Sequence, residues 1–543
     1  MLHTEAGQTG SLFDLVLPEP LRDLPADLAA IDELLKDDAM LAPFRAHWDE
    51  EVKAGLIGST RWGRPTIAMA TYVRLMVLKH RYGWGYEVLV REVSDSLHLR
   101  RFCGIPLHDG GPDESTVRKM TRRLGPQVVD ELIRSVIKKA TTERRLRLRA
   151  MRCDSTVIEA DIHYPTDITL VDDAVRTLVR VASQVVATVP KVTARVRNRG
   201  RAIGKRVRAL GRTLRRRTGE ARSEVEQLTT ESARLLHDTI REASKLRAQA
   251  LRVVRTMREQ PTRAQVRAVV ELAQFVARAE QIAEQTRQRF AGEPIKDRLV
   301  SMFDIHARPI RKGKMASPTQ FGYVVQTTEL TSTTQRGARG LLLPPNMHLG
   351  NPPENELLPD TVTELDTLDL SRRLKVAAFD GGFTLEATRA AMAETNAEVF
   401  IVGSKMNSGS RRHQRRLARY RVGCEGRVSH LKREFGARRS RLKGDVGAHT
   451  WTSWGLPHLQ PPHPGEHPTA AVTACPSSRL RPPPLSPSRT PRRALSCPAS
   501  PRTRSSGVLR VFPGQVISAV LQPAVVVCNP ALQLRTARGR SRA

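Results

Sequence analysis

The chain has 543 residues, more than one hydrophobic core usually supports, so two or three domains are expected. It carries 89 Lys and Arg against 55 Asp and Glu, with a sequence pI of about 11.0, and this excess predicts a polyanionic partner such as nucleic acid. No apolar run is long enough to span a membrane, no signal-peptide core is evident, and the six cysteines form no CxxC pair, which argues against a membrane protein, a structural zinc site and a disulfide framework.

The first part of the chain, residues 1–143, predicts a helical domain. Apolar residues recur at helical spacing over 21–35 and 67–100, and a further helix is expected after Asp113. Several short helices with basic faces suit a DNA-binding unit. An all-helical packing domain explains the same spacing equally well.

The hydrophobic period then changes over residues 146–158. Leu146, Leu148 and Ala150 alternate with arginines, which predicts a β-strand. Asp154 is expected near the middle or the end of this strand.

Residues 172–295 predict a long helical insertion. Its segment 191–217 contains twelve Lys or Arg and no acid. Such a run is usually a solvated face, but its one-sided charge would repel itself, so we favour contacts with a phosphate backbone. The candidate DNA-binding residues chosen from this run are Arg195, Arg197, Arg206 and Arg215.

Residues 296–455 alternate between strand and helix patterns, as expected of a mixed sheet with helices packed on it. The segments 299–307 and 321–330 are β-like and predict a hairpin. The later expected elements are short strands at 374–379 and 399–402, a helix over 385–392 and a basic helix over 411–443.

Three acids stand out by their contexts. Asp154 lies on a strand, Asp380 follows a short apolar strand and precedes a glycine turn, and Glu425 lies on the basic helix. Phosphodiester cleavage by two Mg²⁺ ions about 4 Å apart requires clustered carboxylates of this kind. Asp154, Asp380 and Glu425 are therefore candidates for such chemistry.

The helix that carries Glu425 places Arg421 and Lys432 on the same stripe, four residues before and seven residues after it. A carboxylate flanked by cations is what a DNA-cleaving site needs, with the metal at the scissile phosphate and the cations on neighbouring phosphates. The alternative is an ordinary surface ion pair between Arg421 and Glu425.

These segments resemble bacterial insertion-sequence transposases, especially the ISNCY group. Residues 153–167 resemble the region of the first aspartate, and 379–383 resemble the second-aspartate turn. Arg421, Glu425 and Lys432 match the Arg-x3-Glu-x6-Lys spacing of the third-acid signature. Residues 62–105 are similar to the accompanying N-terminal domain. Tyr420 departs from the pattern, because the family places its tyrosine three residues before the arginine.

The resemblance implies a DDE transposase with an RNase H-like α/β catalytic core. Asp154, Asp380 and Glu425 would bind two Mg²⁺ ions, for which Mn²⁺ can substitute. Arg421, Lys432 and Arg427 would hold DNA phosphates. A metal-activated water would attack the transposon end, and the freed 3′-hydroxyl would then attack target DNA. The implied partners are double-stranded DNA at the terminal inverted repeats and at the target, and further copies of the chain in a homodimer or larger synaptic complex. No membrane is expected, and the implied location is cytoplasmic, at the nucleoid.

The expected domains follow from the patterns and the resemblance together. They are a helical N-terminal DNA-binding domain (1–143), an RNase H-like catalytic domain (144–171 and 296–455), a basic helical insertion (172–295) and a low-complexity tail (456–543). The tail is rich in Pro, Ser and Arg and has no periodicity. A frameshift in the coding sequence explains its abrupt start, and a genuine disordered basic tail is the alternative.

Three other functions remain open at this stage. The first is a catalytically inactive, truncated transposase derivative that acts only as a DNA-binding protein. The second is a basic RNA-binding or nucleoid protein whose acids are incidental. The third is an RNase H-like nuclease of another kind, such as a junction resolvase.

Overall fold

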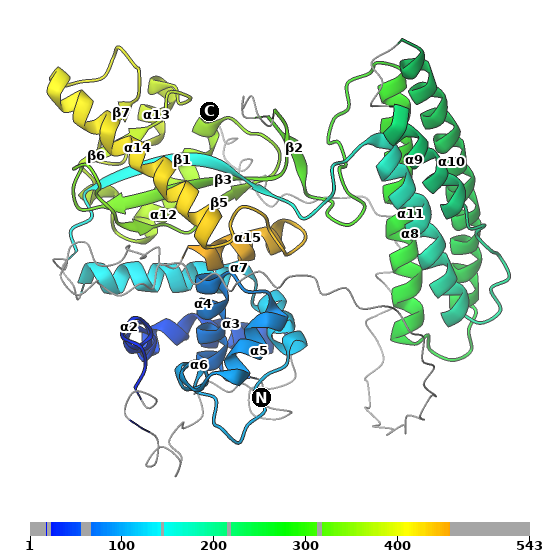
Figure 1. Cartoon of the computed structure of the whole chain (residues 1–543), viewed down its shortest axis with the longest axis horizontal. Coiled ribbons are helices and arrows are strands. Elements are labelled where there is room, and N and C mark those ends of the chain that lie inside the picture. The colour runs from blue at the N-terminus through cyan, green and yellow to red at the C-terminus, as the bar shows by residue number, and fades with distance from the viewer. Residues whose placement is uncertain are drawn as a thin grey trace, which may run out of the picture.

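The computed structural model describes residues 18, 23–55, 67–142, 146–213, 219–311 and 318–456. These residues form an N-terminal group of helices, a mixed β-sheet with helices packed on it, and a bundle of long helices set to one side of both (Figure 1). None of the described helices combines the length and the apolar character needed to cross a membrane.

The N-terminal helices pack around one core that includes Phe44, Tyr72 and Val73. The hydroxyl of Tyr72 donates a hydrogen bond to the Thr121 hydroxyl at 3.1 Å, which ties two of the helices together. The helices expected over 67–100 and after Asp113 are confirmed. The elements of this unit are α2 (Ala26–Leu35), α3 (Asp38–Lys53), α4 (Met69–Tyr82), α5 (Tyr86–Asp95), α6 (Leu97–Cys103) and α7 (Glu114–Thr142).

The sheet has the strand order β2-β3-β1-β6-β7, with β4 and β5 also paired to β3. The central strand β1 runs antiparallel to β3 and parallel to β6, and β6 runs parallel to β7. The strands are β1 (Ala150–Glu159), β2 (Arg308–Ile310), β3 (Gln320–Thr331), β4 (Leu341–Leu342), β5 (Asn346–His348), β6 (Val376–Phe379) and β7 (Glu398–Ile401).

The prediction of a strand over 299–307 is wrong. The backbone of Leu299 is hydrogen-bonded on both sides to the side-chain amide of Gln285, at 3.0 and 3.1 Å, so it has no need of a strand partner. Leu299 and Met302 are buried against the long helices. Their apolar character therefore serves helix packing, and only the short strand β2 follows.

Alternation along β1 decides what each face of the sheet contacts. Met151 and Cys153 face a core shared with helix α7, whereas Ala150 faces a smaller cluster with Leu417 and Tyr420. The strand period places Arg152 and Asp154 on this second face, which the helix α14 (Arg411–Glu434) covers (Figure 1).

The other elements that pack on the sheet or follow it are η2 (Glu354–Leu357), α12 (Leu358–Thr367), η3 (Ser371–Arg373), α13 (Leu385–Ala391) and α15 (Asp445–Gly455).

The long helices form a separate bundle with its own core, which includes Leu178, Leu246 and Phe275. It begins before the expected boundary at residue 172, because the Thr166 hydroxyl accepts a hydrogen bond from the Thr169 amide and so caps the first helix. The helices are α8 (Asp167–Thr188), α9 (Gly200–Thr213), α10 (Gly219–Arg255) and α11 (Arg263–Phe290).

Helix α15 joins the sheet to the N-terminal helices. Trp454 is buried in the N-terminal core with its ring edge-on to Tyr72, at 5.9 Å between ring centroids. The adjacent Ser453 hydroxyl donates a 2.6 Å hydrogen bond to the Asp130 carboxylate on α7. The tail expected from residue 456 onward lies, apart from Leu456, outside the described residues.

Replacing Trp454 with Ala should therefore destabilise the protein strongly. Loss of a buried tryptophan typically costs about 3–5 kcal/mol of unfolding free energy. Chemical denaturation of the full chain measures the change. Val446→Ala is the control on the same helix, because this side chain is 54% exposed and should change stability by less than about 0.5 kcal/mol. Equal effects of the two substitutions would contradict the packing described here.

Candidate active site

Asp154 lies in the middle of β1, on the face that α14 covers. Its backbone is paired opposite Thr327 of β3, whose hydroxyl donates to the Asp154 carbonyl at 3.2 Å. One carboxylate oxygen accepts a 2.9 Å hydrogen bond from the Ser155 amide. The central strand thus holds the first predicted acid in a fixed, largely buried position.

Asp380 is the first residue after β6. Strand β6 pairs in parallel with β1, with Arg152 opposite Ala378, and continuing this register brings Asp380 level with Asp154. The following turn is tied to η2, because the Asn355 side chain donates to the Thr384 hydroxyl at 3.0 Å and accepts from the Thr384 amide. Neighbouring parallel strands therefore present the first two acids side by side.

Helix α14 is seated on the sheet by a cluster of buried charges. The Glu329 carboxylate on β3 is fully buried and accepts hydrogen bonds from Arg152 at 2.7 Å and from the Gly340 amide at 2.9 Å. Arg427 of α14 lies 3.0 Å from the same carboxylate. Arg152 also donates to the Tyr420 carbonyl at 2.7 Å. Together these contacts fix how far α14 can slide or rotate.

Two residues of α14 show how closely the helix approaches the sheet. A methyl group at Gly423 would lie 1.9 Å from a guanidinium nitrogen of Arg152, so this position has no room for a side chain. Tyr420 is buried, and its hydroxyl lies 2.7 Å from that of Thr331. Tyr420 therefore anchors the helix to β3, and its position next to Arg421 is structural.

The seated helix brings Arg421 and Glu425 to the two aspartates. The Arg421 guanidinium lies 3.1 Å from Asp154, 3.5 Å from Asp380 and 3.3 Å from Glu425. The arginine is only 2% exposed, whereas the side chains of Asp380 and Glu425 are 52% and 67% exposed. The three predicted acids thus converge on one buried cation.

The electrostatics of this group favour keeping Arg421 charged. Burial lowers the pKa of Arg421, but the surrounding acids, Asp154 first, more than offset this, and the net shift is upward. Burial raises the pKa of Asp154, the Arg421 charge opposes that rise, and the carboxylates of Glu354 and Asp380 add to it. Burial and charge pairing therefore shift the pKa values of Asp154 and Arg421 in opposite directions.

Glu354 is a fourth acid near the site, and sequence reasoning missed it. It lies on η2, and its carboxylate is near enough to Asp154 to raise the pKa of that group. A methyl group at Gly382 would lie 3.2 Å from the Glu354 carboxylate, so this acid also borders the turn after Asp380. Glu354 directly follows Pro352 and Pro353 in a segment without strand or helical periodicity, so the sequence offered no signal.

Each of the three acids contacts Arg421. Within the part of the chain that the structure describes, no three His, Cys, Asp or Glu side chains lie close enough together to hold one metal ion. The carboxylates that could hold a cation are those of Asp154, Asp380 and Glu425, with Glu354 nearby. Two of them are mostly exposed side chains that can rotate without leaving a packed core.

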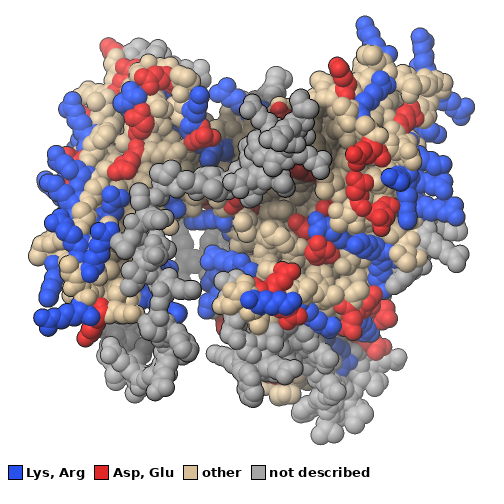
Figure 2. All heavy atoms as spheres, turned by 180° about the vertical axis from the view of Figure 1, so that it is seen from behind, with Lys and Arg blue, Asp and Glu red and all other residues tan. Residues whose placement is uncertain are grey.

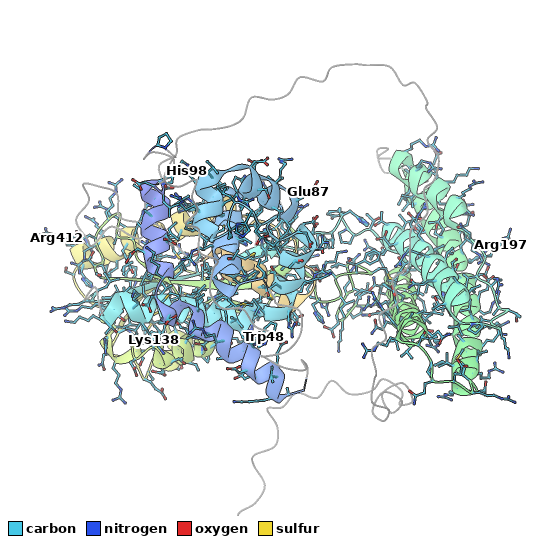
Figure 3. All side chains as sticks on the ribbon, turned by 90° about the horizontal axis from the view of Figure 1, so that it is seen from below. Trp48, Glu87, His98, Lys138, Arg197 and Arg412 are labelled. Carbon is cyan, nitrogen blue, oxygen red and sulfur yellow. The ribbon has the colours of Figure 1, made fainter. Side chains whose placement is uncertain are left out.

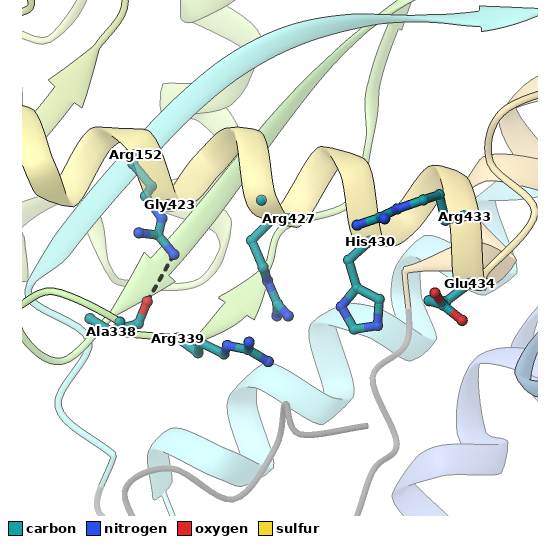
Figure 4. Close-up of a pocket in the computed structure, with 10 residues that line it drawn as sticks. Arg152, Ala338, Arg339, Gly423, Arg427, His430, Arg433 and Glu434 are labelled. Atoms are coloured by element: carbon teal, nitrogen blue, oxygen red, sulfur yellow. Dashed lines mark hydrogen bonds between the residues drawn. The ribbon is translucent and has the colours of Figure 1, made fainter. Parts of the chain in front are cut away.

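Arg427, another cation predicted on α14, pairs with Glu329 and not with the three candidate acids. Arg427 is buried and donates to the Gly340 carbonyl at 3.0 Å, and two of its guanidinium nitrogens have no hydrogen-bond partner among the described residues. It borders a cavity of about 400 Å³ with Arg339, His430 and Arg433, and Figure 4 shows Arg427 and His430 projecting from α14 toward Arg339. Lys432 is partly buried. Arg421 and Arg427, which were expected to hold DNA phosphates, are both buried.

The basic segment of the insertion is divided by its ion pairs. Arg206 pairs with Glu231 at 3.0 Å and Arg199 with Glu242 at 2.6 Å, so α10 supplies acids that the local sequence lacks. Arg195 and Arg197 are exposed, and Arg197 points outward from the bundle (Figure 3). Arg215 lies outside the described residues. Figure 2 shows Lys and Arg side chains gathered along this bundle with a few acids among them.

Comparison with known proteins relates the N-terminal helices to a transposase domain. Residues 21–123, which include α2 to α6 and the start of α7, match the family described as "Transposase domain (DUF772)". A transposase family is therefore supported. The chain is also 32% identical over 127 residues to "Uncharacterized protein ORF8 in nfe locus" of Rhizobium meliloti, an alignment that covers 22% of this chain. It spans 61% of that relative. No solved structure matches the chain.

The close seat of α14 gives a test of the site's framework. Gly423→Ala should displace Arg152 and remove one of the two arginines that pair with the buried Glu329 carboxylate, at a cost of about 3–5 kcal/mol of unfolding free energy. Gly426→Ala on the same helix is the matched control, because a methyl group there meets no atom within 4 Å. The control should stabilise the helix by about 1 kcal/mol. Denaturation curves that rank the two variants the other way would show that α14 sits differently.

Proposed function

We propose that this protein is a DDE transposase that cleaves DNA at transposon ends and joins the freed ends to target DNA. The convergence of Asp154, Asp380 and Glu425 on Arg421 carries the proposal, because these acids come from a strand, a strand end and a helix that lie far apart in sequence. The transposase-domain match at residues 21–123 supports the same reading.

The sheet supports an RNase H-like core for this enzyme. An antiparallel pair, β3 and β1, continues into the parallel strands β6 and β7, and the acids lie on the central strand and at the end of its parallel neighbour. Active sites of α/β sheets commonly form at the carboxyl ends of parallel strands. The third acid reaches this edge from α14.

The chemistry of the donors fits Mg²⁺, or Mn²⁺ in its place. Asp154, Asp380 and Glu425 offer only oxygen atoms, as Mg²⁺ prefers, and they already surround a cation, the guanidinium of Arg421. When bound, the metal would activate water and neutralise charge on the scissile phosphate. Asp154 is the fixed ligand in this scheme, while Asp380 and Glu425 have exposed side chains free to reorient.

Arg421 has a positioning role in this proposal. Its charge opposes the rise that burial causes in the pKa of Asp154, and its contacts draw the three carboxylates toward one point. Without that cation the neighbouring carboxylates would repel one another. The proposed partners are transposon-end DNA, target DNA and a second copy of the chain.

A second candidate function is a DNA-binding derivative that does not cleave. One observation favours it: Arg421 occupies the space among the acids that a cation would need. Cleavage of the flanking inverted repeats by purified protein with Mg²⁺ separates the two candidates.

The three acids should be required for cleavage but not for binding. Asp154→Asn, Asp380→Asn or Glu425→Gln should each abolish nicking of a transposon-end duplex, because each removes a ligand charge, and chelation of the metal should do the same. Affinity for the duplex should stay near the wild-type value. Glu386→Gln, an exposed acid on α13, is the control and should cleave normally. Full nicking activity in any of the three variants would show that the wrong acid was chosen.

The exposed cations of α9 should contribute to binding along the DNA backbone. Arg201, Lys205 and Arg208 have no carboxylate partner among the described residues. Replacing them and Arg197 with Gln should flatten the dependence of log affinity on log salt by about 0.9 for each phosphate that is no longer neutralised. Arg199→Gln is the control, because this side chain is already paired with Glu242. An unchanged slope in the multiple variant would return this segment to an ordinary solvated face.

A further inference from the structure

A second cavity lies where the N-terminal helices meet the end of the catalytic unit. Its volume is about 630 Å³. Lys79 and His80 line it from the last turn of α4, and Arg438 and Arg441 line it from the loop after α14. Trp451 of α15 completes one wall. The cavity is therefore built by two parts of the chain that are far apart in sequence.

Lys79 is the unusual member of this cavity. It is 2% exposed, and its ammonium lies over the rings of Trp451 and Tyr86, at 4.1 and 4.8 Å from the ring centroids. Among the described residues no carboxylate forms an ion pair with it. Burial, with a smaller contribution from Arg441, lowers the pKa of Lys79 to about 7. Aromatic rings alone do not compensate a buried ammonium fully.

The neighbouring groups leave the cavity short of negative charge. Arg439 pairs with Glu159 at 3.2 Å and Arg441 with Asp161 at 3.5 Å, but no described carboxylate pairs with Arg438. Burial keeps the pKa of His80 well below its usual value, and the Nε2 atom of this residue has no hydrogen-bond partner among the described residues. Lys79 and Arg438 are therefore the two cations of this cavity for which the described part of the chain supplies no paired carboxylate.

The backbone around the cavity also favours an anion. Gly83, Trp84 and Gly85 line it, and Gly85 is the N-cap of α5 without any side-chain cap. No N-cap side chain therefore bonds the first amide groups of α5, and the positive end of the helix dipole lies next to Gly85. A helix terminus and a buried lysine point to one ligand chemistry independently.

We propose that this cavity binds a phosphate of the DNA backbone through Lys79, Arg438 and Arg441. The inference rests on the proposed function, because that function supplies DNA as the ligand. The volume accommodates a phosphate with its sugar, and the wall at Trp84, which is stacked on the exposed ring of Tyr82 at 4.6 Å, offers an aromatic surface beside it. A phosphate held here would be gripped by the N-terminal helices and the catalytic unit together.

Lys79→Met in the full chain separates a ligand site from a structural lysine. Methionine fills the space between Trp451 and Tyr86 without a buried charge, so the variant should melt at the same or a higher temperature than wild type in chloride buffer. Inorganic phosphate at equal ionic strength should raise the melting temperature of wild type more than that of the variant. For a short DNA duplex, the salt slope of log affinity should fall by about 0.9 in Lys79→Met and further in Arg438→Gln/Arg441→Gln.

The controls are Lys53→Met and Arg373→Gln, exposed residues of the N-terminal helices and of η3, which should behave as wild type. A wild-type salt slope in Lys79→Met would overturn the proposal, and a lower melting temperature with that slope would make Lys79 structural. Loss of the phosphate effect with an unchanged DNA slope would mean a free-phosphate site and would overturn the assignment to DNA. Cleavage is measured separately, and absence of metal-dependent nicking in wild type counts against the proposed function. The salt slope of DNA affinity tests whether the cavity binds DNA, whatever the cleavage result.

Discussion

The buried carboxylate of Glu329 is the group on which the candidate site depends. It joins Arg152 on the central strand to Arg427 on α14, and all three side chains are almost completely removed from water. Buried ion pairs of this kind add little net stability, but breaking one leaves a charge without a partner. Their effect is therefore to fix one position of α14 on the sheet. Because Arg421 lies within two helical turns of both Gly423 and Arg427, that position decides whether the arginine reaches Asp154 at all.

Helix α14 takes part in two charged clusters of opposite composition. At Glu329 two arginines share one buried carboxylate, whereas at Arg421 three carboxylates share one buried guanidinium. The second group is net negative when every acid is ionised, and Glu354 adds to that charge. A DNA phosphate brought to this edge would meet repulsion unless further positive charge came with it. In the proposed function a divalent cation would supply that charge, and this charge balance is independent of any likeness to other proteins.

Local patterns in the sequence predicted the elements that carry the acids, because strand alternation before Asp154, a glycine turn after Asp380 and the helical spacing around Glu425 are all short-range signals. They could not predict which groups would meet. Arg421 and Arg206 were both expected to bind DNA phosphates, yet the fold surrounds Arg421 with the three acids, and α10 brings Glu231 to Arg206. Glu354 and Lys79 were missed for the same reason: their significance comes from burial beside residues distant in the chain. The apolar run at 299–307 was misassigned because buried loops and strands share that composition.

A net charge of +34 predicts a polyanionic partner without saying where it binds, and pairing within the fold narrows the choice. Arg199, Arg206 and Arg427 already have acids beside them, so their charge is largely satisfied within the chain. Exposed cations on α9 would attract DNA weakly and additively, and salt would screen each interaction. A cation that is buried with no carboxylate paired to it among the described residues, as Lys79 is, differs in kind, because the cost of its burial is already present before any ligand arrives. Binding an anion there removes that cost, so such a site would fix where DNA lies relative to the acids and would not merely hold it near the surface.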